Sequence, residues 1–249
     1  MRHSLTTRIS AFAIIIATLA CVAFSSSASA DWQSDLDPLL KKYVKPTGVD
    51  YKSWKASKTD MATLDSIVSS IGSDPLPAAK SDARLAHLIN SYNALIINRI
   101  LDDYPTKGVG SNGVARKLFF GGNKLKVAGD KTSFNDLEND LIRKNFDEPR
   151  IHFAINCAST SCPPLKASSY RAATLDKDLE AMTRAFLTKN DHGIKIEDGK
   201  PHVSEIFKWF KEDFDKAGGV AKFIGKYRDL KGASIEFQDY DWSLNEAKR

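Results

Sequence analysis

Residues 82–104, DARLAHLINSYNALIINRILDDY, are the longest periodic stretch of the chain and set its fold class. At 100° per residue, a few polar residues collect on one narrow side, which we expect to face solvent: Arg84, Ser91, Asn98 and Asp102. Almost all other positions are apolar, and Pro105 ends the stretch because proline cannot continue a helix. The pattern predicts a long helix that is buried on all but one side.

Two asparagines, Asn90 and Asn93, fall inside the apolar arc of this helix. A buried amide without partners costs about 1 to 3 kcal/mol, so the pair requires fixed donors and acceptors opposite it. One interpretation is that the amides tie down a loop from inside. The other is that they orient a catalytic histidine or hold a substrate carbonyl. His87, one turn before Asn90, is expected at the surface.

Apolar spacing predicts further helices, and short β-prone runs predict a few strands. The helices are expected near residues 32–44, 60–71, 134–144, 176–188, 204–215 and 219–228. Strands are expected at 151–156, near 194–203 and near 233–238, with a hairpin joining 117–120 to 124–128 across Gly121-Gly122-Asn123. Together these elements predict a helix-rich α+β domain with a small, mostly antiparallel sheet.

The first thirty residues have the layout of a secretory signal peptide. Two arginines precede an apolar run, Ala11 to Phe24, which is shorter than the roughly 20 residues that a membrane-spanning helix needs. Ala28-Ser29-Ala30 then forms an A-x-A cleavage site. We therefore expect residues 1–30 to be removed. Lipidation at Cys21, after Leu19-Ala20, is the less favoured alternative.

Residues 31–249 are expected to form one exported domain, periplasmic or secreted, with no later run that is apolar and long enough to span a membrane. Loss of Arg2 and Arg8 lowers the formal net charge from +5 to +3, and the lysines are interspersed with acids. This charge pattern does not favour nucleic-acid binding.

The densest group of reactive side chains lies in residues 150–164, RIHFAINCASTSCPP. If 151–156 is a straight strand, His152 and Cys157 lie roughly 16 Å apart on opposite faces, so a catalytic pair requires a bend or the return of Cys162. The same return suits a disulfide between the two cysteines of the mature chain. Three interpretations stay open: a disulfide, a free reactive thiol, and a metal site whose spacing matches no common zinc motif.

Other polar candidates are weaker. Ser133 is expected to cap a helix, and Glu138 in that helix is typical of a solvated acid. An aromatic group repeats at helical spacing and indicates core: Phe207, Trp209, Phe210 and Phe214. The sequence contains no phosphate-binding glycine loop, nucleophile elbow or H-E-x-x-H motif, so we assign no cofactor, and a metal site is the least favoured of the three interpretations above.

Six motifs, taken in order, resemble the exported bacterial branch of the domain of unknown function 547 family. They are Gly48-Val49-Asp50-Tyr51, Ile89 to Leu95, Tyr104-Pro105, Asn135 to Glu138, His152 to Pro164, and Tyr240 to Asn245. The resemblance runs from about residue 36 to 245 and brings no established activity.

This chain departs from the family pattern at two places. It has His87-Leu88 where relatives have an aromatic pair, and Asn139 where relatives have a histidine after the glutamate of the Asp-x-Glu motif. Plant relatives lack one or both cysteines. The resemblance therefore favours His152, Asn90 and Asn93 as what the family shares.

The leading hypothesis is a hydrolase or acyltransferase that acts on amide or ester bonds of a small-molecule or peptide substrate. The candidate site residues are His152, Cys157, Cys162, Asn90, Asn93 and Glu138. A cysteine would be the nucleophile, the histidine the general base, and an asparagine the orienting or oxyanion group. By analogy alone, such a site suits a papain-like or transglutaminase-like fold. The alternative is a non-catalytic domain whose Cys157–Cys162 disulfide fixes a recognition loop for a cell-envelope partner.

Overall fold

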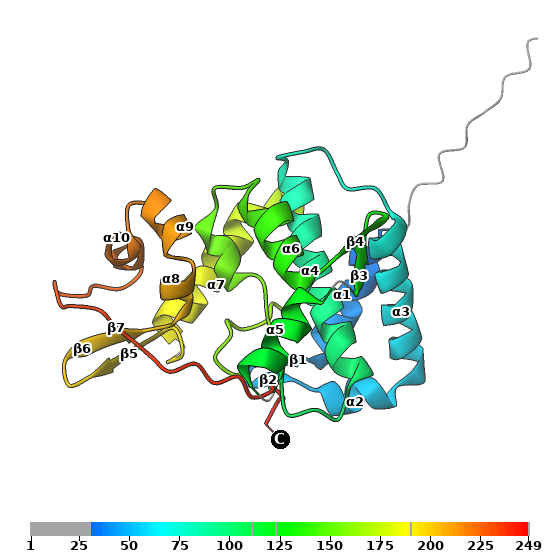
Figure 1. Ribbon diagram of the computed structural model, residues 1–249, viewed down its shortest axis with the longest axis horizontal. Coiled ribbons are helices and arrows are strands. Elements are labelled where there is room, and N and C mark those ends of the chain that lie inside the picture. The colour runs from blue at the N-terminus through cyan, green and yellow to red at the C-terminus, as the bar shows by residue number, and fades with distance from the viewer. Residues whose placement is uncertain (1–30, 111, 123, 190, 249) are drawn as a thin grey trace, which may run out of the picture. The chain divides into compact units, whose positions relative to one another are not determined.

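Helices account for most of the regular structure of this protein (Figure 1). The computed structural model describes residues 31–110, 112–122, 124–189 and 191–248, and the expected signal peptide, with Cys21, lies outside them. The α-helices are α1 (Trp32–Tyr43), α2 (Tyr51–Ala56), α3 (Lys58–Ser73), α4 (Asp82–Asp102), α5 (Gly113–Gly121), α6 (Phe134–Asp136), α7 (Leu175–Lys189), α8 (Ile206–Trp209), α9 (Lys211–Lys216) and α10 (Val220–Gly225). Tighter or wider helical turns form η1 (Leu137–Arg143, a π-helix), η2 (Pro149–Phe153, 3₁₀) and η3 (Ala172–Thr174, 3₁₀).

Within the described residues, the strands form three small sheets. They are β1 (Val44–Lys45), β2 (Gly48–Val49), β3 (Leu125–Val127), β4 (Asp130–Thr132), β5 (Ile194–Glu197), β6 (Lys200–Val203) and β7 (Glu236–Phe237). The pairs β1-β2, β3-β4 and β5-β6 are antiparallel, and β7 adds to β6 in parallel through His202 opposite Glu236. The predicted helix-rich α+β class, with small and mostly antiparallel sheets, is confirmed.

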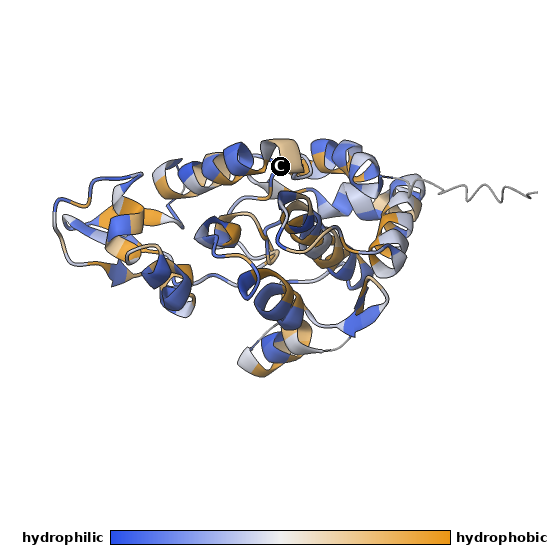
Figure 2. Cartoon of the chain, turned by 90° about the horizontal axis from the view of Figure 1, so that it is seen from above, coloured by the Kyte–Doolittle hydropathy of each residue, from blue (hydrophilic) through white to orange (hydrophobic). Residues whose placement is uncertain are grey.

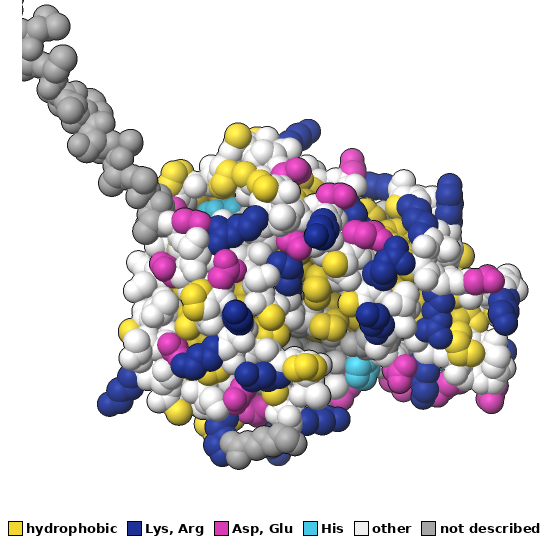
Figure 3. All heavy atoms as spheres, turned by 180° about the vertical axis from the view of Figure 1, so that it is seen from behind, with side chains coloured by type: hydrophobic (Ala, Val, Ile, Leu, Met, Phe, Trp, Pro, Cys, Tyr) yellow, Lys and Arg dark blue, Asp and Glu magenta, His cyan; other side chains and the backbone are white. Residues whose placement is uncertain are grey.

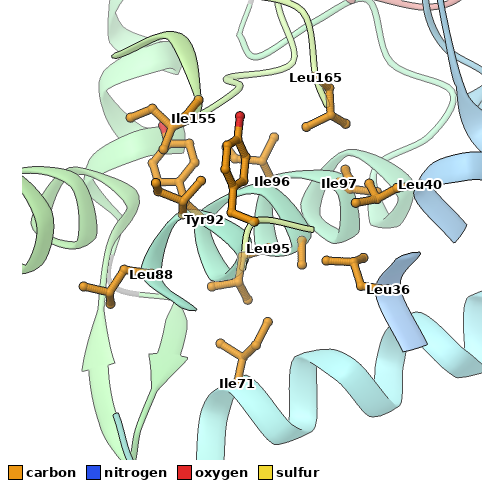
Figure 4. Packing of buried hydrophobic residues seen from close by; sticks show 14 of the residues in the cluster. Leu36, Leu40, Ile71, Leu88, Tyr92, Leu95, Ile96, Ile97, Ile155 and Leu165 are labelled. Atoms are coloured by element: carbon orange, nitrogen blue, oxygen red, sulfur yellow. The ribbon is translucent and has the colours of Figure 1, made fainter. Parts of the chain in front are cut away.

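Helix α4 lies at the centre of the larger hydrophobic core. Ser81 caps its start by accepting a hydrogen bond from the backbone N–H of Arg84. Figure 4 shows that the α4 side chains Leu95 and Ile97 point toward residues of α3 and α1, namely Ile71, Leu36 and Leu40. Packing on several sides thus fixes the position of α4. The groups that its polar side chains contact are fixed with it.

Two polar residues predicted at the surface of α4 are buried instead. Ser91 is fully buried, and its hydroxyl donates to the carbonyl of His87, one turn earlier, at 2.8 Å. His87 is buried against the ring of Trp32, 5.1 Å away edge to face. For Ser91 the prediction was wrong because a hydroxyl that bonds its own helix backbone is buried at little cost. For His87 it was wrong because the residue that covers it, Trp32, comes from another helix, which the periodicity of α4 does not reveal.

A second hydrophobic core forms around five phenylalanines: Phe153, Phe186, Phe207, Phe214 and Phe223. They come from η2 and from helices α7 to α10, and strands β5 and β6 complete the cluster with Ile194 and Val203. Figure 2 shows that the apolar residues of the helices are concentrated on their inward sides. The short turn η2 thus contributes to both cores, with Phe153 in the second and Ile151 in the first.

The predicted hairpin across Gly121 and Gly122 is wrong. Residues 117–120 belong to α5, whose start Asn112 caps by accepting from the N–H of Ala115. The hairpin forms one step later, between β3 and β4, where Ala128 and Gly129 take positive φ values of 51° and 94°. The N–H groups of these two turn residues donate to carbonyls at the end of α3, so tertiary contact fixes the turn.

The C-terminal segment crosses several distant parts of the chain. Isolated β-bridges join Glu246 to Val49, Ser243 to Gly108, and Leu244 to Ser159. This path places Tyr240 and Trp242 beside the turn that follows η2. The segment therefore completes a site whose other residues come from the middle of the chain.

None of the helices described is long and apolar enough to cross a bilayer. On the face shown in Figure 3, basic and acidic side chains are interspersed, as the sequence indicates.

Candidate functional site

The turn that holds the reactive side chains is helical and not a strand. Glu148 caps η2 by accepting from the N–H of Arg150, and Pro149 supplies the first helical residue. The N–H of Ala154 and that of Ile155 then donate to the carbonyl of Ile151. The predicted strand at 151–156 is wrong, since a short apolar run does not distinguish a strand from a buried helical turn. The separation of His152 and Cys157 that a straight strand implies therefore does not hold.

A cavity of about 170 Å³ lies beside this turn. It is lined by Tyr92, Phe120, Asn135, Glu138, His152, Ile155, Cys157, Cys162, Pro163, Ile206, Trp209, Phe210, Tyr240 and Trp242. The structure thus brings together four of the residues that the sequence singled out, namely Glu138, His152, Cys157 and Cys162. We call this space the thiol cavity.

The sulfur of Cys157 lies within hydrogen-bond distance of two hydroxyl groups. Its Sγ lies 2.9 Å from Oγ of Ser159 and 3.3 Å from the hydroxyl of Tyr240. Burial favours the neutral thiol, but hydrogen bonds from Cys162, Ser159 and Tyr240 outweigh it and lower the pKa of Cys157 to about 6. These hydrogen bonds therefore favour the thiolate, the form that acts as a nucleophile.

Cys162 has the opposite character. Its Sγ accepts from the backbone N–H of Cys157 at 2.9 Å, and burial together with the neighbouring Cys157 sulfur raises its pKa well above the usual range. Both cysteines are free thiols, so the disulfide considered from the sequence is not formed in this structure. The chain turns back after Cys157, so that the backbone N–H of Cys157 is the donor and the sulfur of Cys162 is the acceptor.

His152 is held by the Asp213 carboxylate. Its Nε2 lies 2.8 Å from Oδ2 of Asp213, and its ring stacks on Phe210 with 4.0 Å between centroids. Burial acts to raise the pKa of Asp213, but hydrogen bonds from His152 and Arg143 hold it well below the usual range. Because a carboxylate only accepts, Nε2 carries the proton and Nδ1 carries the lone pair.

Nδ1 of His152 has no hydrogen-bond partner among the described residues, and it lies 3.8 Å from Oε1 of Glu138. Burial lowers the pKa of His152, so its ring is neutral at neutral pH. The histidine thus presents an unprotonated nitrogen next to a carboxyl group.

Glu138 is not the solvated helix acid that its sequence position indicates. Its side chain is 13% exposed and lies on the π-helix η1, a widened turn that often occurs at functional sites. Burial is the largest cause that raises its pKa to about 8, and the nearby charges of Cys157 and Asp213 add to it. Glu138 is therefore mostly protonated at neutral pH and is able to donate a proton.

Asn90 and Asn93 do not line the thiol cavity, and backbone groups satisfy both amides. Asn93 donates to the carbonyl of Ala154 at 3.0 Å and accepts from the N–H of Asn156 at 2.8 Å. Asn90 does the same with the carbonyl and N–H of Tyr170, both at 2.8 Å. The interpretation that the pair ties down loops from inside is confirmed. Because both amide groups already have these partners, neither supports the oxyanion role considered from the sequence.

Sequence reasoning missed Asp213 and the aromatic wall of the cavity. Phe207 and Phe214 are core as predicted, but Phe210 lines the cavity, as does Trp209, which is 43% exposed. The sequence contains no signal for Asp213, because Lys211, Glu212 and Asp213 together separate Phe210 from Phe214 and resemble an ordinary charged helix face. Tyr240 and Trp242 belong to a motif that the resemblance marked without assigning it a role.

In the part of the chain that the structure describes, no three His, Cys, Asp or Glu side chains are arranged to hold a metal ion. Residues 76–187 match the model of a family described as "Protein of unknown function, DUF547". The matched region contains α4 and Glu138, His152, Cys157 and Cys162, whereas Asp213 and Tyr240 lie beyond it. No curated protein and no solved structure matches the chain.

Proposed function

We propose that this chain, which belongs to the DUF547 family through residues 76–187, is a thiol-dependent hydrolase or acyltransferase that acts on amide or ester bonds. One observation carries the proposal. A single cavity contains a cysteine whose pKa is about 6, a glutamic acid whose pKa is about 8, and a histidine oriented by a carboxylate. Between those two pKa values, nucleophile and proton donor are both in the form that acyl transfer needs.

In the first step, the thiolate of Cys157 attacks the carbonyl carbon of the substrate and forms a C–S bond. The bond from that carbon to the leaving nitrogen or oxygen breaks, and the Glu138 carboxyl gives its proton to the leaving atom. The products are a thioester on Cys157, a free amine or alcohol, and a Glu138 carboxylate. Nucleophile and acid act without an added base, since the thiolate exists beforehand.

In the second step, water attacks the thioester while Nδ1 of His152 takes its proton. The C–S bond breaks and the thiolate returns. The His152 proton then passes to the Glu138 carboxylate, 3.8 Å away, which restores the starting state. In a transferase, an amine or alcohol takes the place of water. Asp213 acts as a positioning residue that fixes the tautomer of His152.

The dependence on the leaving group tests these roles. We would compare hydrolysis of a p-nitrophenyl ester with hydrolysis of the matching ethyl ester by the wild type and by Glu138→Gln, Cys157→Ser and Cys162→Ser variants. A p-nitrophenolate leaves without a proton, so Glu138→Gln should slow the ethyl ester about tenfold or more relative to the p-nitrophenyl ester. Cys157→Ser should abolish turnover of both, and Cys162→Ser, the matched control, should retain it.

Turnover that persists in Cys157→Ser would contradict the proposal. So would equal losses on both esters in Glu138→Gln. A wild type that turns over no ester or amide in a broad panel would instead support a non-catalytic binding domain.

We also propose that the protein acts outside the cytoplasm. The support is the sequence of residues 1–30, with its arginines, apolar run and A-x-A site. Intact mass spectrometry of the protein from its native host should give a chain that begins at Asp31. A chain that still contains residues 1–30 would contradict export by this route, and a lipid-modified Cys21 would replace it with a membrane anchor.

A further inference from the structure

A second and larger cavity, of about 700 Å³, lies next to the thiol cavity. The end of α4, the segment 103–110, helix α5 and residues 242–243 form its walls. Four cationic side chains line it: Arg99, Lys107, Arg116 and Lys124. Asp103 is the one carboxylate among its described lining residues. We call this space the basic cavity.

Most of its positive charge is not neutralised. Arg99 pairs with Asp103 at 2.9 Å, which accounts for the carboxylate. Within the described residues, Lys107, Arg116 and Lys124 form no ion pair. The guanidinium of Arg116 lies 4.8 Å from the centre of the Trp242 ring instead, which orients it without cancelling its charge. Three cations therefore remain available to an anionic ligand.

The two cavities share a wall. Trp242 lines both, and the neighbouring residues Phe119 and Phe120 are divided between them, with Phe120 in the thiol cavity. Phe134 and Asn135 are divided in the same way. The two cavities therefore adjoin at Trp242, and a ligand that occupies both has to pass this side chain.

Close backbone contacts fix the wall of the basic cavity. A Cβ atom on Gly108 would lie 2.4 Å from the carbonyl oxygen of Trp242, and one on Gly110 would lie 2.7 Å from the backbone nitrogen of Arg116. Both glycines have positive φ, 146° and 130°. Only glycine allows this approach, so segment 103–110 is held against Trp242 and α5 before any ligand binds.

We propose that the basic cavity binds an acidic stretch of a peptide whose reacting bond lies beside Cys157. This inference rests on the proposed function and names its substrate class. The three unpaired cations favour an anionic ligand, and the one guanidinium among them, that of Arg116, matches carboxylate geometry. The rim also includes Leu118, which is 69% exposed and gives an apolar contact for the peptide chain. An extended peptide spans adjoining spaces in a way that a small acid does not.

The experiment measures binding of two acetylated, amidated pentapeptides, pentaglutamate and pentaglutamine, by calorimetry at two salt concentrations. The test variant is Lys107→Gln with Lys124→Gln. Its matched control is Lys52→Gln with Lys55→Gln, two exposed lysines of α2 that line neither cavity. We expect the wild type and the control to bind pentaglutamate, the test variant to bind it about tenfold more weakly, and added salt to weaken binding.

Equal affinity of the wild type for both peptides, or unchanged affinity in the test variant, would overturn the assignment. Tight binding of inorganic phosphate without binding of pentaglutamate would overturn it as well, because the cavity would then select a phosphate. Cys157→Ser separates this inference from the proposed function. This variant should lose turnover and keep its affinity for pentaglutamate. Turnover thus tests the role of Cys157, and peptide affinity tests the role of the basic cavity, each independently of the other.

Discussion

The asparagine pair of α4 and the residues of the thiol cavity both place polar side chains in apolar surroundings, yet they differ in what those side chains contact. Asn90 and Asn93 bond to backbone N–H and C=O groups on both sides of each amide. Nδ1 of His152 has no hydrogen-bond partner in the described part of the chain, and Glu138 and Cys157 have strongly shifted pKa values.

This difference separates structural from chemical roles. A buried polar group whose partners are all provided stabilises one conformation and has little capacity left for a ligand. A buried group that keeps an open lone pair, or a proton at an unusual pKa, is costly to the fold and available to a substrate. The comparison predicts that substitutions in the cavity reduce activity more than stability, and that substitutions of the pair do the reverse.

The largest effect is expected for Cys157. Cys157→Ser should lower kcat/KM by roughly 10³-fold or more, since a serine hydroxyl is not ionised at neutral pH. Cys162→Ala should cost only about tenfold at pH 7, because it removes one donor that lowers the pKa of Cys157, and activity should recover at higher pH. Steady-state kinetics measured across pH would check both expectations. Equal losses of kcat/KM in the two variants would contradict the assignment of Cys157 alone as the nucleophile.

Glu138 should give the next largest effect and a pH signature. The rate should rise as Cys157 ionises near pH 6 and fall as Glu138 loses its proton near pH 8, so kcat/KM follows a bell between those values. Glu138→Gln should reduce kcat/KM for an alkyl ester about 10²-fold and remove the fall at high pH. If kcat/KM of this variant still falls at high pH, a group other than Glu138 causes the fall.

The asparagines should show the reverse pattern. Asn93→Ala leaves the carbonyl of Ala154 and the N–H of Asn156 without partners, and should lower the free energy of unfolding by about 2 to 3 kcal/mol. Asn98→Ala, on the same helix, should change it by less than about 0.5 kcal/mol, because its amide bonds an exposed acid. Urea unfolding would measure both, and a large loss of activity per folded Asn93→Ala molecule would contradict the structural role.

The sequence was sufficient for elements defined by long periodic patterns. Helices α4 and α7 were correct, since their apolar spacing extends over many residues, and the strand region near 194–203 was correct although its two strands have four residues each. Shorter runs failed where tertiary contacts decide the conformation. Residues 117–120 became helical behind the Asn112 cap, and 151–156 became a turn buried between two cores.

The candidate site was also visible only in part. Cys157, His152 and Glu138 were identified as candidates from residue type, and they do line one cavity. The pKa shifts, the partner Asp213 and the closing residues Tyr240 and Trp242 depend on contacts across many residues of the chain. Local pattern contains no information on such contacts, whereas the burial of Asn90 and Asn93 followed from the helix alone.

The most direct test of the account is the pKa of the Cys157 thiol in the folded wild-type protein. The rate of alkylation by iodoacetamide would be followed from pH 4 to 10, with peptide mass spectrometry to separate Cys157 from Cys162. The account predicts a midpoint at about pH 6 for Cys157 and little reaction at Cys162 over this range. A midpoint near the usual thiol value of 9.0, or equal reaction at both cysteines, would contradict it.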